Sequence, residues 1–170
     1  MSLALGAVIF LSLSAQIAVR LPFSPVPVTM QTLAVLTVGI LYGSQRGALS
    51  ILSYLAAGAL GLPVFANGGA GLVYMCGPTG GYLMGFVFAA WSVGFLAQRG
   101  WDRKVWLTLF ASIVGLICIF IFGLAWLALF VGADKVIALG LMPFIPGAIY
   151  KLALLSLTVP AGWKIIGKRR

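Results

Sequence analysis

The sequence predicts an all-α integral membrane protein, a single bundle of six transmembrane helices. Of its 170 residues, 62% are apolar and only 8% are charged, and the mean hydropathy is +1.16. Soluble domains are nearer half apolar and a quarter charged. A spanning helix needs about 20 mostly apolar residues, so this length accommodates about six spans and no additional soluble domain. We therefore expect one domain over residues 1–170.

Six apolar runs mark the expected spans, and they lie at residues 3–19, 28–42, 47–65, 78–97, 105–132 and 143–163. The second run is short for a bilayer and the fifth is long, which helix tilt or local bilayer thinning accommodates. The first run follows no basic segment and precedes no convincing small-residue cleavage site. We interpret it as a span rather than a removed signal peptide.

The basic residues predict the orientation of these spans. The chain has eleven Lys and Arg against two acids, and cytoplasmic loops of membrane proteins collect Lys and Arg. With a cytoplasmic N-terminus, two basic residues lie outside, Arg20 and Lys135. Eight lie inside: Arg46, Arg99, Arg103, Lys104, Lys164, Lys168, Arg169 and Arg170. This asymmetry predicts that both termini are cytoplasmic.

The composition argues against catalysis. There is no histidine, which excludes a His-ligated metal and an imidazole base. The acids Asp102 and Asp134 are isolated and make a poor carboxylate pair. We interpret Cys76 and Cys118 as reduced packing residues, because two thiols are too few for a disulfide framework. A membrane enzyme would depend on Cys76 alone, whose pKa nothing but a helix terminus would lower. We expect no enzyme, metal or cofactor.

The three expected outer connections are more elaborate than the inner ones. The first, residues 20–32, holds three prolines and should form a stiff, extended loop, because proline removes a donor and restricts its predecessor. The second, residues 66–83, is rich in glycine around Asn67 and Thr79. The inner connections are short and basic. The contrast between the proline-rich and glycine-rich outer connections and the short inner ones indicates that a ligand is captured from outside.

Lys151 lies inside the sixth run, where a charged side chain costs a few kcal/mol or more and usually has a partner, cavity or pathway. The ammonium could face inward and meet an anionic ligand near the outer end of the span. Alternatively, Lys151 could snorkel outward or pair with Asp134. Because an uncompensated charge in a span is costly, we favour the interpretation in which Lys151 meets an anionic ligand.

The segment GPTGGYLMG has two interpretations. Gly77, Gly81 and Gly85 are spaced by four, so they share one helix face and could admit a neighbouring backbone. The start of this helix also leaves free backbone donors, and Thr79 and Tyr82 lie beside them, where polar ligand groups could dock. Tyr82 could equally be an interfacial anchor.

Gln31, just inside the second run, is a further polar group that prefers a cavity or a helix partner to lipid. Together with Lys151 it favours binding or transport of a small anion. A different class of function also fits the residues: a structural or lipid-interacting membrane subunit, in which Lys151 faces lipid headgroups and the glycines only pack.

Four segments in order, PFSPVPVTMQTLAVL, GALSILSYLAAGALGLPVF, GPTGGYLMGF and PFIPGAIYKL, resemble the BioY family, the biotin-binding S-components of energy-coupling factor (ECF) transporters. The resemblance covers nearly the whole chain. It implies a six-helix S-component bundle in the bacterial inner (cytoplasmic) membrane that binds biotin with high affinity under its outer loops. Biotin would be the transported ligand rather than a cofactor.

The resemblance also implies partners and site residues. A BioY protein works among membrane lipids, either with a coupling protein and ATPase subunits or self-associated if solitary, and binds no nucleic acid. Tyr82 and Lys151 match family positions associated with the ligand, and Gln31, Asn67 and Thr79 complete the expected ligand-binding set. Biotin suits these groups, because its carboxylate can pair with a cation, its ureido group needs donors and acceptors, and its rings pack on apolar walls.

The sixth span departs from the family pattern. Where the family usually reads Pro-Gly-Asp, this chain has Ala148, so a carboxylate one turn before Lys151 is lost. The alternative ligand is therefore a related small carboxylic acid.

The first helix departs as well. S-components that dock on the coupling protein often show an Ala-x-x-x-Ala surface, whereas Leu5 and Ile9 hold the corresponding positions here. Only Ser14 and Ala18 have a comparable spacing. This departure argues against docking on a shared energising module.

Overall fold

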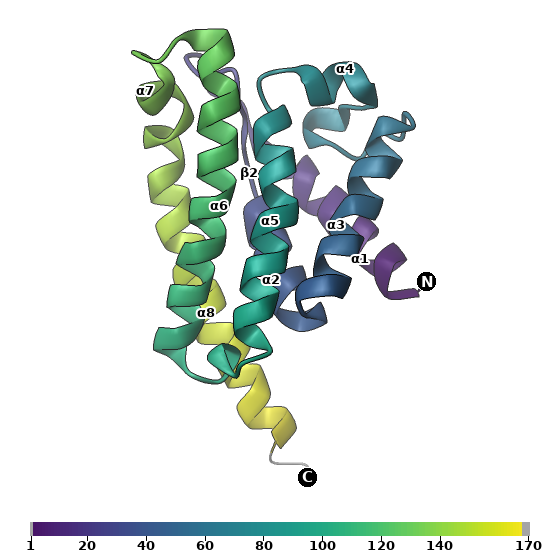
Figure 1. Ribbon diagram of the computed structural model, residues 1–170, viewed down its shortest axis with the longest axis vertical. Helices are drawn as coiled ribbons and strands as arrows, with labels where there is room; N and C mark the ends of the chain where they lie inside the picture. The colour runs from purple at the N-terminus through teal and green to yellow at the C-terminus, as the bar shows by residue number, and fades with distance from the viewer. Residues whose placement is uncertain (1, 168–170) are drawn as a thin grey trace.

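Apolar runs of this chain form helices, because a segment in lipid must satisfy its backbone hydrogen bonds internally. The computed structural model describes residues 2–167, and within them six helices have twelve or more residues (Figure 1). These are α1 (Ser2–Gln16), α2 (Gln31–Tyr42), α3 (Ser44–Ala59), α5 (Gly80–Ala97), α6 (Val105–Val131) and α8 (Ile145–Gly167). The six-helix bundle agrees with the fold class that the sequence predicts.

Two helices end before the apolar runs that predict them. α1 ends at Gln16, after which strand β1 (Ala18–Val19) pairs antiparallel with β2 (Val28–Thr29), with Ala18 opposite Thr29. α3 ends at Ala59 rather than at residue 65. Pro63 cannot donate to a helix and disfavours helical geometry before it, so hydropathy alone overestimates this helix. The proline-rich segment between β1 and β2 is non-helical, as predicted.

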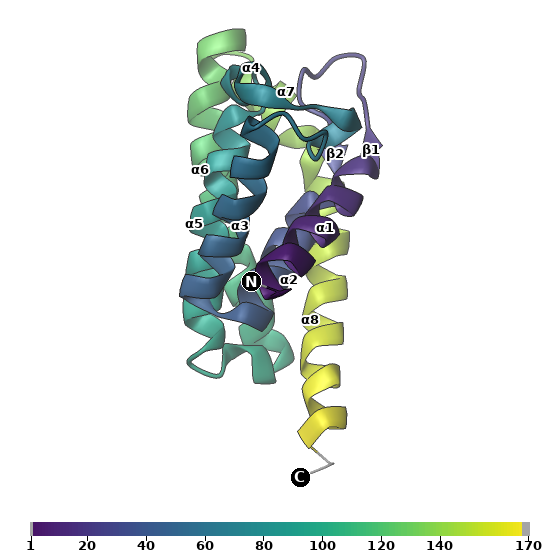
Figure 2. The same cartoon turned by 90° about the vertical axis from the view of Figure 1, so that its right-hand side faces the viewer.

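The short elements gather at one end of the bundle (Figure 2). They are the β1–β2 hairpin, η1 (Ala66–Gly68), α4 (Gly71–Cys76), α7 (Val136–Gly140) and η3 (Met142–Phe144). At the other end, Gly43 alone joins α2 to α3, and η2 (Trp101–Arg103) joins α5 to α6. Gly43 has φ +79°, which glycine adopts without strain. We call the elaborate end the outer end.

α5 lies at the centre and packs against α2, α3 and α6. Its glycines allow the closest of these contacts: a Cβ at Gly81 would lie 2.3 Å from Cβ of Trp126, and one at Gly85 would lie 2.8 Å from Cα of Ile119. The packing interpretation therefore holds for Gly81 and Gly85. Gly77 precedes the helix, and its carbonyl accepts a hydrogen bond from the Trp126 indole at 3.0 Å.

The outward surface of the bundle is apolar, as expected of a multi-pass membrane protein. By length and composition, three segments of residues 2–167 could cross a membrane: α5, α6 and the run Val136–Ile165. The most apolar stretch of α6 has a hydropathy of 2.8, although only 22% of it is buried. Such a helix favours lipid as its surroundings. α1 and α2 are shorter apolar helices.

The contact between α5 and α6 predicts the effect of enlarging Gly85. In Gly85→Leu the new side chain meets backbone atoms of α6 that cannot rotate aside, so we expect a loss of about 1–3 kcal/mol in the free energy of unfolding. A lower melting temperature in detergent would report it. Gly162→Ala in α8 is the control, because nothing lies within 4 Å of the added Cβ. An unchanged melting temperature of Gly85→Leu would contradict this packing.

Candidate ligand-binding site

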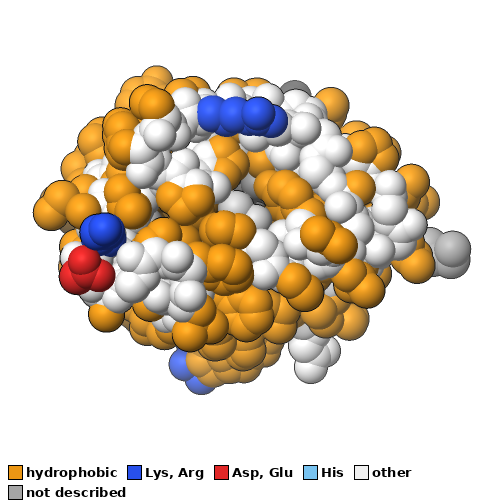
Figure 3. Space-filling model, turned by 90° about the horizontal axis from the view of Figure 1, so that it is seen from above, with side chains coloured by type: hydrophobic (Ala, Val, Ile, Leu, Met, Phe, Trp, Pro, Cys, Tyr) orange, Lys and Arg blue, Asp and Glu red, His pale blue; other side chains and the backbone are white. Residues whose placement is uncertain are grey.

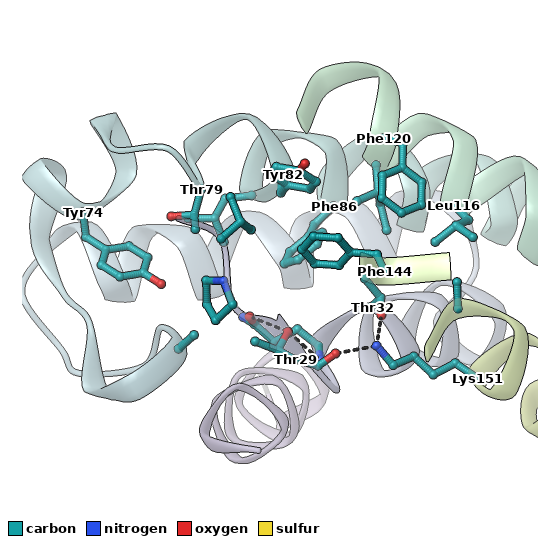
Figure 4. A pocket seen from close by; sticks show the side chains of 17 residues that line it. Thr29, Thr32, Tyr74, Thr79, Tyr82, Phe86, Leu116, Phe120, Phe144 and Lys151 are labelled. Carbon is teal, nitrogen blue, oxygen red and sulfur yellow. Dashed lines mark hydrogen bonds between the residues drawn. The ribbon is translucent and has the colours of Figure 1, made fainter. Parts of the chain in front are cut away.

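A narrow cavity lies among α2, α5, α6 and α8 beneath the outer segments (Figure 4). The centre of a water molecule can occupy only about 40 Å³ of it. Most of the lining is apolar or aromatic. The polar side chains of the lining are Thr29, Gln31, Thr32, Tyr74, Thr79, Tyr82 and Lys151.

The Lys151 side chain enters this cavity from α8 and is only 7% exposed. Its ammonium donates to the carbonyl oxygen of Thr29 at 2.5 Å and to the hydroxyl of Thr32 at 2.9 Å. Both acceptors are neutral, and an ammonium has three donors. Figure 4 shows this group on the side of the cavity opposite Tyr82 and Phe120.

The charge of Lys151 therefore has no carboxylate partner in the part of the chain that the structure describes, where the one ion pair joins Arg103 to Asp102. The snorkelling alternative is wrong for this structure, because the side chain is buried. The alternative pairing with Asp134 is also wrong, since the ammonium bonds to two threonines. Among residues 2–167, the third N–H of the ammonium has no acceptor and its charge has no opposite charge beside it, so both are available to an anion.

Gln31 opens α2 and belongs to a chain of hydrogen bonds that crosses the bundle. Its amide oxygen accepts from the Thr29 hydroxyl at 3.2 Å, and its amide nitrogen donates to the Tyr54 hydroxyl at 2.6 Å. Tyr54 in turn donates to the carbonyl of Val64 at 2.9 Å. Gln31 thus lines the cavity and at the same time joins the start of α2 to Tyr54 of α3, which in turn holds the segment before η1.

Tyr82 belongs to an aromatic cluster on the cavity wall. Its ring stacks on Phe144 with centroids 5.8 Å apart and meets Phe120 edge-on at 6.4 Å. Its hydroxyl donates to the carbonyl of Gly140 at 2.8 Å, so the phenol already has an acceptor in α7. A Cβ at Gly123 would lie 2.4 Å from the ring. Glycine at that position in α6 therefore makes room for Tyr82.

The structure brings four of the five expected ligand-binding residues to one cavity: Gln31, Thr79, Tyr82 and Lys151. Asn67 is not among them. It is exposed at the outer end and has φ 57°, the left-handed conformation that Asn tolerates better than most residues. It lines a second, outer hollow instead.

Sequence reasoning missed other groups at this site. Thr29 and Thr32 hold Lys151, and Phe144 lines the cavity. The polar run VTMQT directly after the prolines was a usable signal for the threonines, because it places several hydroxyls at the start of an apolar helix. For Phe144 there was no such signal, since aromatic residues are common throughout these spans.

The sequence model of the BioY family matches residues 1–168. The chain belongs to the BioY family. It is 43% identical over 142 residues to "Probable biotin transporter BioY" of Pyrococcus horikoshii, which covers 84% of this chain and 82% of the relative. It is 36% identical to "Biotin transporter BioY" of Rhizobium etli over 98% of this chain and 95% of the relative.

A solved structure has the same fold. It is titled "Crystal structure at 2.1 A of the S-component for biotin from an ECF-type ABC transporter". The match has a TM-score of 0.86 at 25% sequence identity and covers 96% of this chain and 89% of that chain. The family membership and the fold that the four segments imply are thereby confirmed.

The hydrogen bond from the Tyr82 hydroxyl to the Gly140 carbonyl predicts a local effect of removing that hydroxyl. Tyr82→Phe keeps the ring against Phe144 but loses one hydrogen bond, which contributes about 1 kcal/mol. We expect faster hydrogen exchange in residues 136–140 and a slightly lower melting temperature. Tyr150→Phe is the matched control, because Tyr150 is 71% exposed. Unchanged exchange in α7 of Tyr82→Phe would show that the hydrogen bond does not hold this segment.

Proposed function

We propose that this chain is the substrate-specificity subunit of a biotin uptake system, a transport protein and not an enzyme, which captures biotin from the outer side. The observation that carries the proposal is the buried ammonium of Lys151 in an aromatic-walled cavity. A buried charge without an opposite charge is costly, and the carboxylate of biotin would compensate it. The names of the two biotin transporters that this chain resembles agree with this ligand.

The cavity offers a complementary surface to each part of biotin. The carboxylate accepts a hydrogen bond from the remaining N–H of Lys151. The bicyclic ring packs against Tyr82 and Phe144, which stack on one another. The ureido group needs both donors and acceptors, which Gln31 and Thr79 provide at the cavity wall. Such sites combine an apolar wall with a few placed polar groups.

The cavity walls must separate to admit biotin, because only about 40 Å³ is open to the centre of a water molecule. Side-chain hydrogen bonds join the outer segments above the cavity to one another and to α1. Ser24 donates to the carbonyl of Leu139 at 2.8 Å, and Gln16 bonds both to the carbonyl of Phe65 and to the amide of Gly68 at 3.1 Å. Breaking these bonds opens the outer end, and their return would exclude water after binding.

A related small carboxylic acid is the second candidate ligand. The observation that favours it is Ala148, which is buried and lines the cavity, so the site lacks a carboxylate there. An acid without a ureido group would lose less from that absence than biotin does. Competition of lipoate, a carboxylic acid without a ureido group, against labelled biotin separates the two candidates.

We further propose that the chain lies in the cytoplasmic membrane with both termini inside and works with ECF components. The described basic residues Arg46, Arg99 and Lys164 lie towards the inner end, whereas Arg20 and Lys135 lie at the outer end. Lys168, Arg169 and Arg170 lie outside the described residues. Biotin is the cargo in this scheme, and no cofactor is required.

Biotin titration of the purified protein tests the proposed ligand. Lys151→Met keeps the aliphatic stem and removes the charge. Losing one partner of a buried charged contact costs about 2–5 kcal/mol, so the dissociation constant should rise well over tenfold. Lys151→Arg should weaken binding too, because a planar fork does not replace a compact ammonium.

The control for this titration is Lys135→Met, which removes an exposed outer lysine. It should bind biotin as the wild type does. Wild-type affinity in Lys151→Met would exclude the proposed carboxylate contact, and a wild-type protein that ignores biotin would exclude biotin as the ligand.

Cysteine labelling in intact cells tests the orientation. After Cys76 and Cys118 are replaced, a membrane-impermeant probe should label Ala133→Cys, which is exposed in the outer connection before α7. Gln45→Cys, exposed near the start of α3, should react only after the membrane is opened. The reverse labelling pattern would invert the proposed orientation.

A further inference from the structure

A second hollow lies directly outside the ligand cavity, between the proline-rich and glycine-rich segments. We call it the outer vestibule, and its lining residues are Arg20, Leu21, Ser24, Pro25, Pro27, Ala66, Asn67, Gly69, Tyr74, Gly77, Pro78 and Thr79. The centre of a water molecule can occupy about 570 Å³ of it, against about 40 Å³ in the inner cavity. The vestibule is therefore the roomier of the two.

Four residues line both hollows: Pro27, Ala66, Tyr74 and Thr79. They form a neck between the vestibule and the cavity. A molecule that reaches the cavity through the vestibule passes these side chains. Since Lys151 lines only the inner hollow and Arg20 only the outer one, the two cations lie on opposite sides of the neck.

Tyr74 is the large side chain of the neck. Its ring stacks on Phe65 with centroids 5.1 Å apart, and a Cβ at Gly69 would lie 2.3 Å from it. Phe65 and the bare backbone at Gly69 thus hold the ring in place. Burial raises the pKa of the Tyr74 phenol, against the smaller opposing effects of Thr79 and of the Arg20 charge. The phenol is neutral, so it presents no negative charge to an incoming anion.

Arg20 gives the vestibule a positive charge that no acid in residues 2–167 offsets there. Asp134 is exposed and lies next to Lys135 in the chain, and neither of them lines the vestibule. Figure 3 looks onto the outer end and shows a mostly apolar or uncharged surface with few basic side chains. The lining of this hollow therefore carries one basic side chain and no acidic one.

We propose that the outer vestibule is an encounter site, in which Arg20 attracts the carboxylate of the incoming ligand before the ligand passes Tyr74 and Thr79 to reach Lys151. The inference rests on the proposed function, because it assumes an anionic ligand. An exposed charge of this kind raises the association rate more than the final affinity. Salt weakens the effect, since the Debye length is about 10 Å at 0.1 M ionic strength.

Stopped-flow association kinetics test the encounter site. Wild type, Arg20→Gln, Arg20→Lys and Lys135→Gln are compared with biotin in zwitterionic nanodiscs at low and high salt. At low salt, Arg20→Gln should associate roughly threefold or more slowly, with an unchanged dissociation rate. Arg20→Lys should keep most of the rate, and Lys135→Gln should match the wild type. At high salt the four proteins should converge.

Biotin amide provides the ligand-side control, because without a carboxylate its association rate should be the same in wild type and Arg20→Gln. An Arg20→Gln protein with wild-type association at low salt would overturn the encounter site while biotin binding stands. Faster dissociation at an unchanged association rate would also overturn it, because Arg20 would then contact the bound ligand. A wild-type protein that binds no biotin would overturn both proposals.

Discussion

The ammonium of Lys151 is the constraint on which the site depends. It is buried in a membrane-spanning helix. Within residues 2–167 it donates hydrogen bonds to two neutral acceptors, the carbonyl of Thr29 and the hydroxyl of Thr32. Those bonds fasten α8 to the start of α2 at the outer end. They orient the charge but do not neutralise it, and a buried charge without an opposite charge beside it is costly. The proposed anionic ligand would supply that opposite charge.

The rest of the molecule divides into a packed frame and loosely joined outer segments. In the frame, α5 packs against α2, α3 and α6 at glycine contacts that no larger side chain would fit. At the outer end, side-chain hydrogen bonds of Ser24, Gln16 and Tyr82 join segments that are far apart in sequence. The cavity thus lies between the packed frame and these outer segments.

The sequence patterns predict the six helices of the bundle and the buried charge of Lys151. They fail where the conformational preferences of the backbone, rather than hydropathy, decide the local structure. The six apolar runs became six helices, and Lys151 was conspicuous because charge is rare in a span. The end of α3 was misplaced, because Leu60 and Leu62 continue the apolar run past Ala59 although Pro63 prevents the helix from continuing. Asn67 was assigned to the site for its polarity, whereas it adopts a left-handed turn outside the cavity. The run VTMQT indicates that Thr32 lies near the start of a span, but its contact with Lys151 joins residues far apart in the sequence and depends on how α8 packs against α2.

The proposed contact between the Lys151 ammonium and the carboxylate of biotin is central to the function of this site. A thermodynamic cycle measures the contribution of that contact directly. Dissociation constants are determined by calorimetry for biotin and for biotin amide, each with wild type and with Lys151→Met. If the ammonium meets the carboxylate, the wild type prefers biotin over the amide by at least about tenfold, which corresponds to 1.4 kcal/mol, and Lys151→Met largely loses this preference. Equal preference in both proteins would contradict the account, because the lysine would then not sense the group that distinguishes the two ligands.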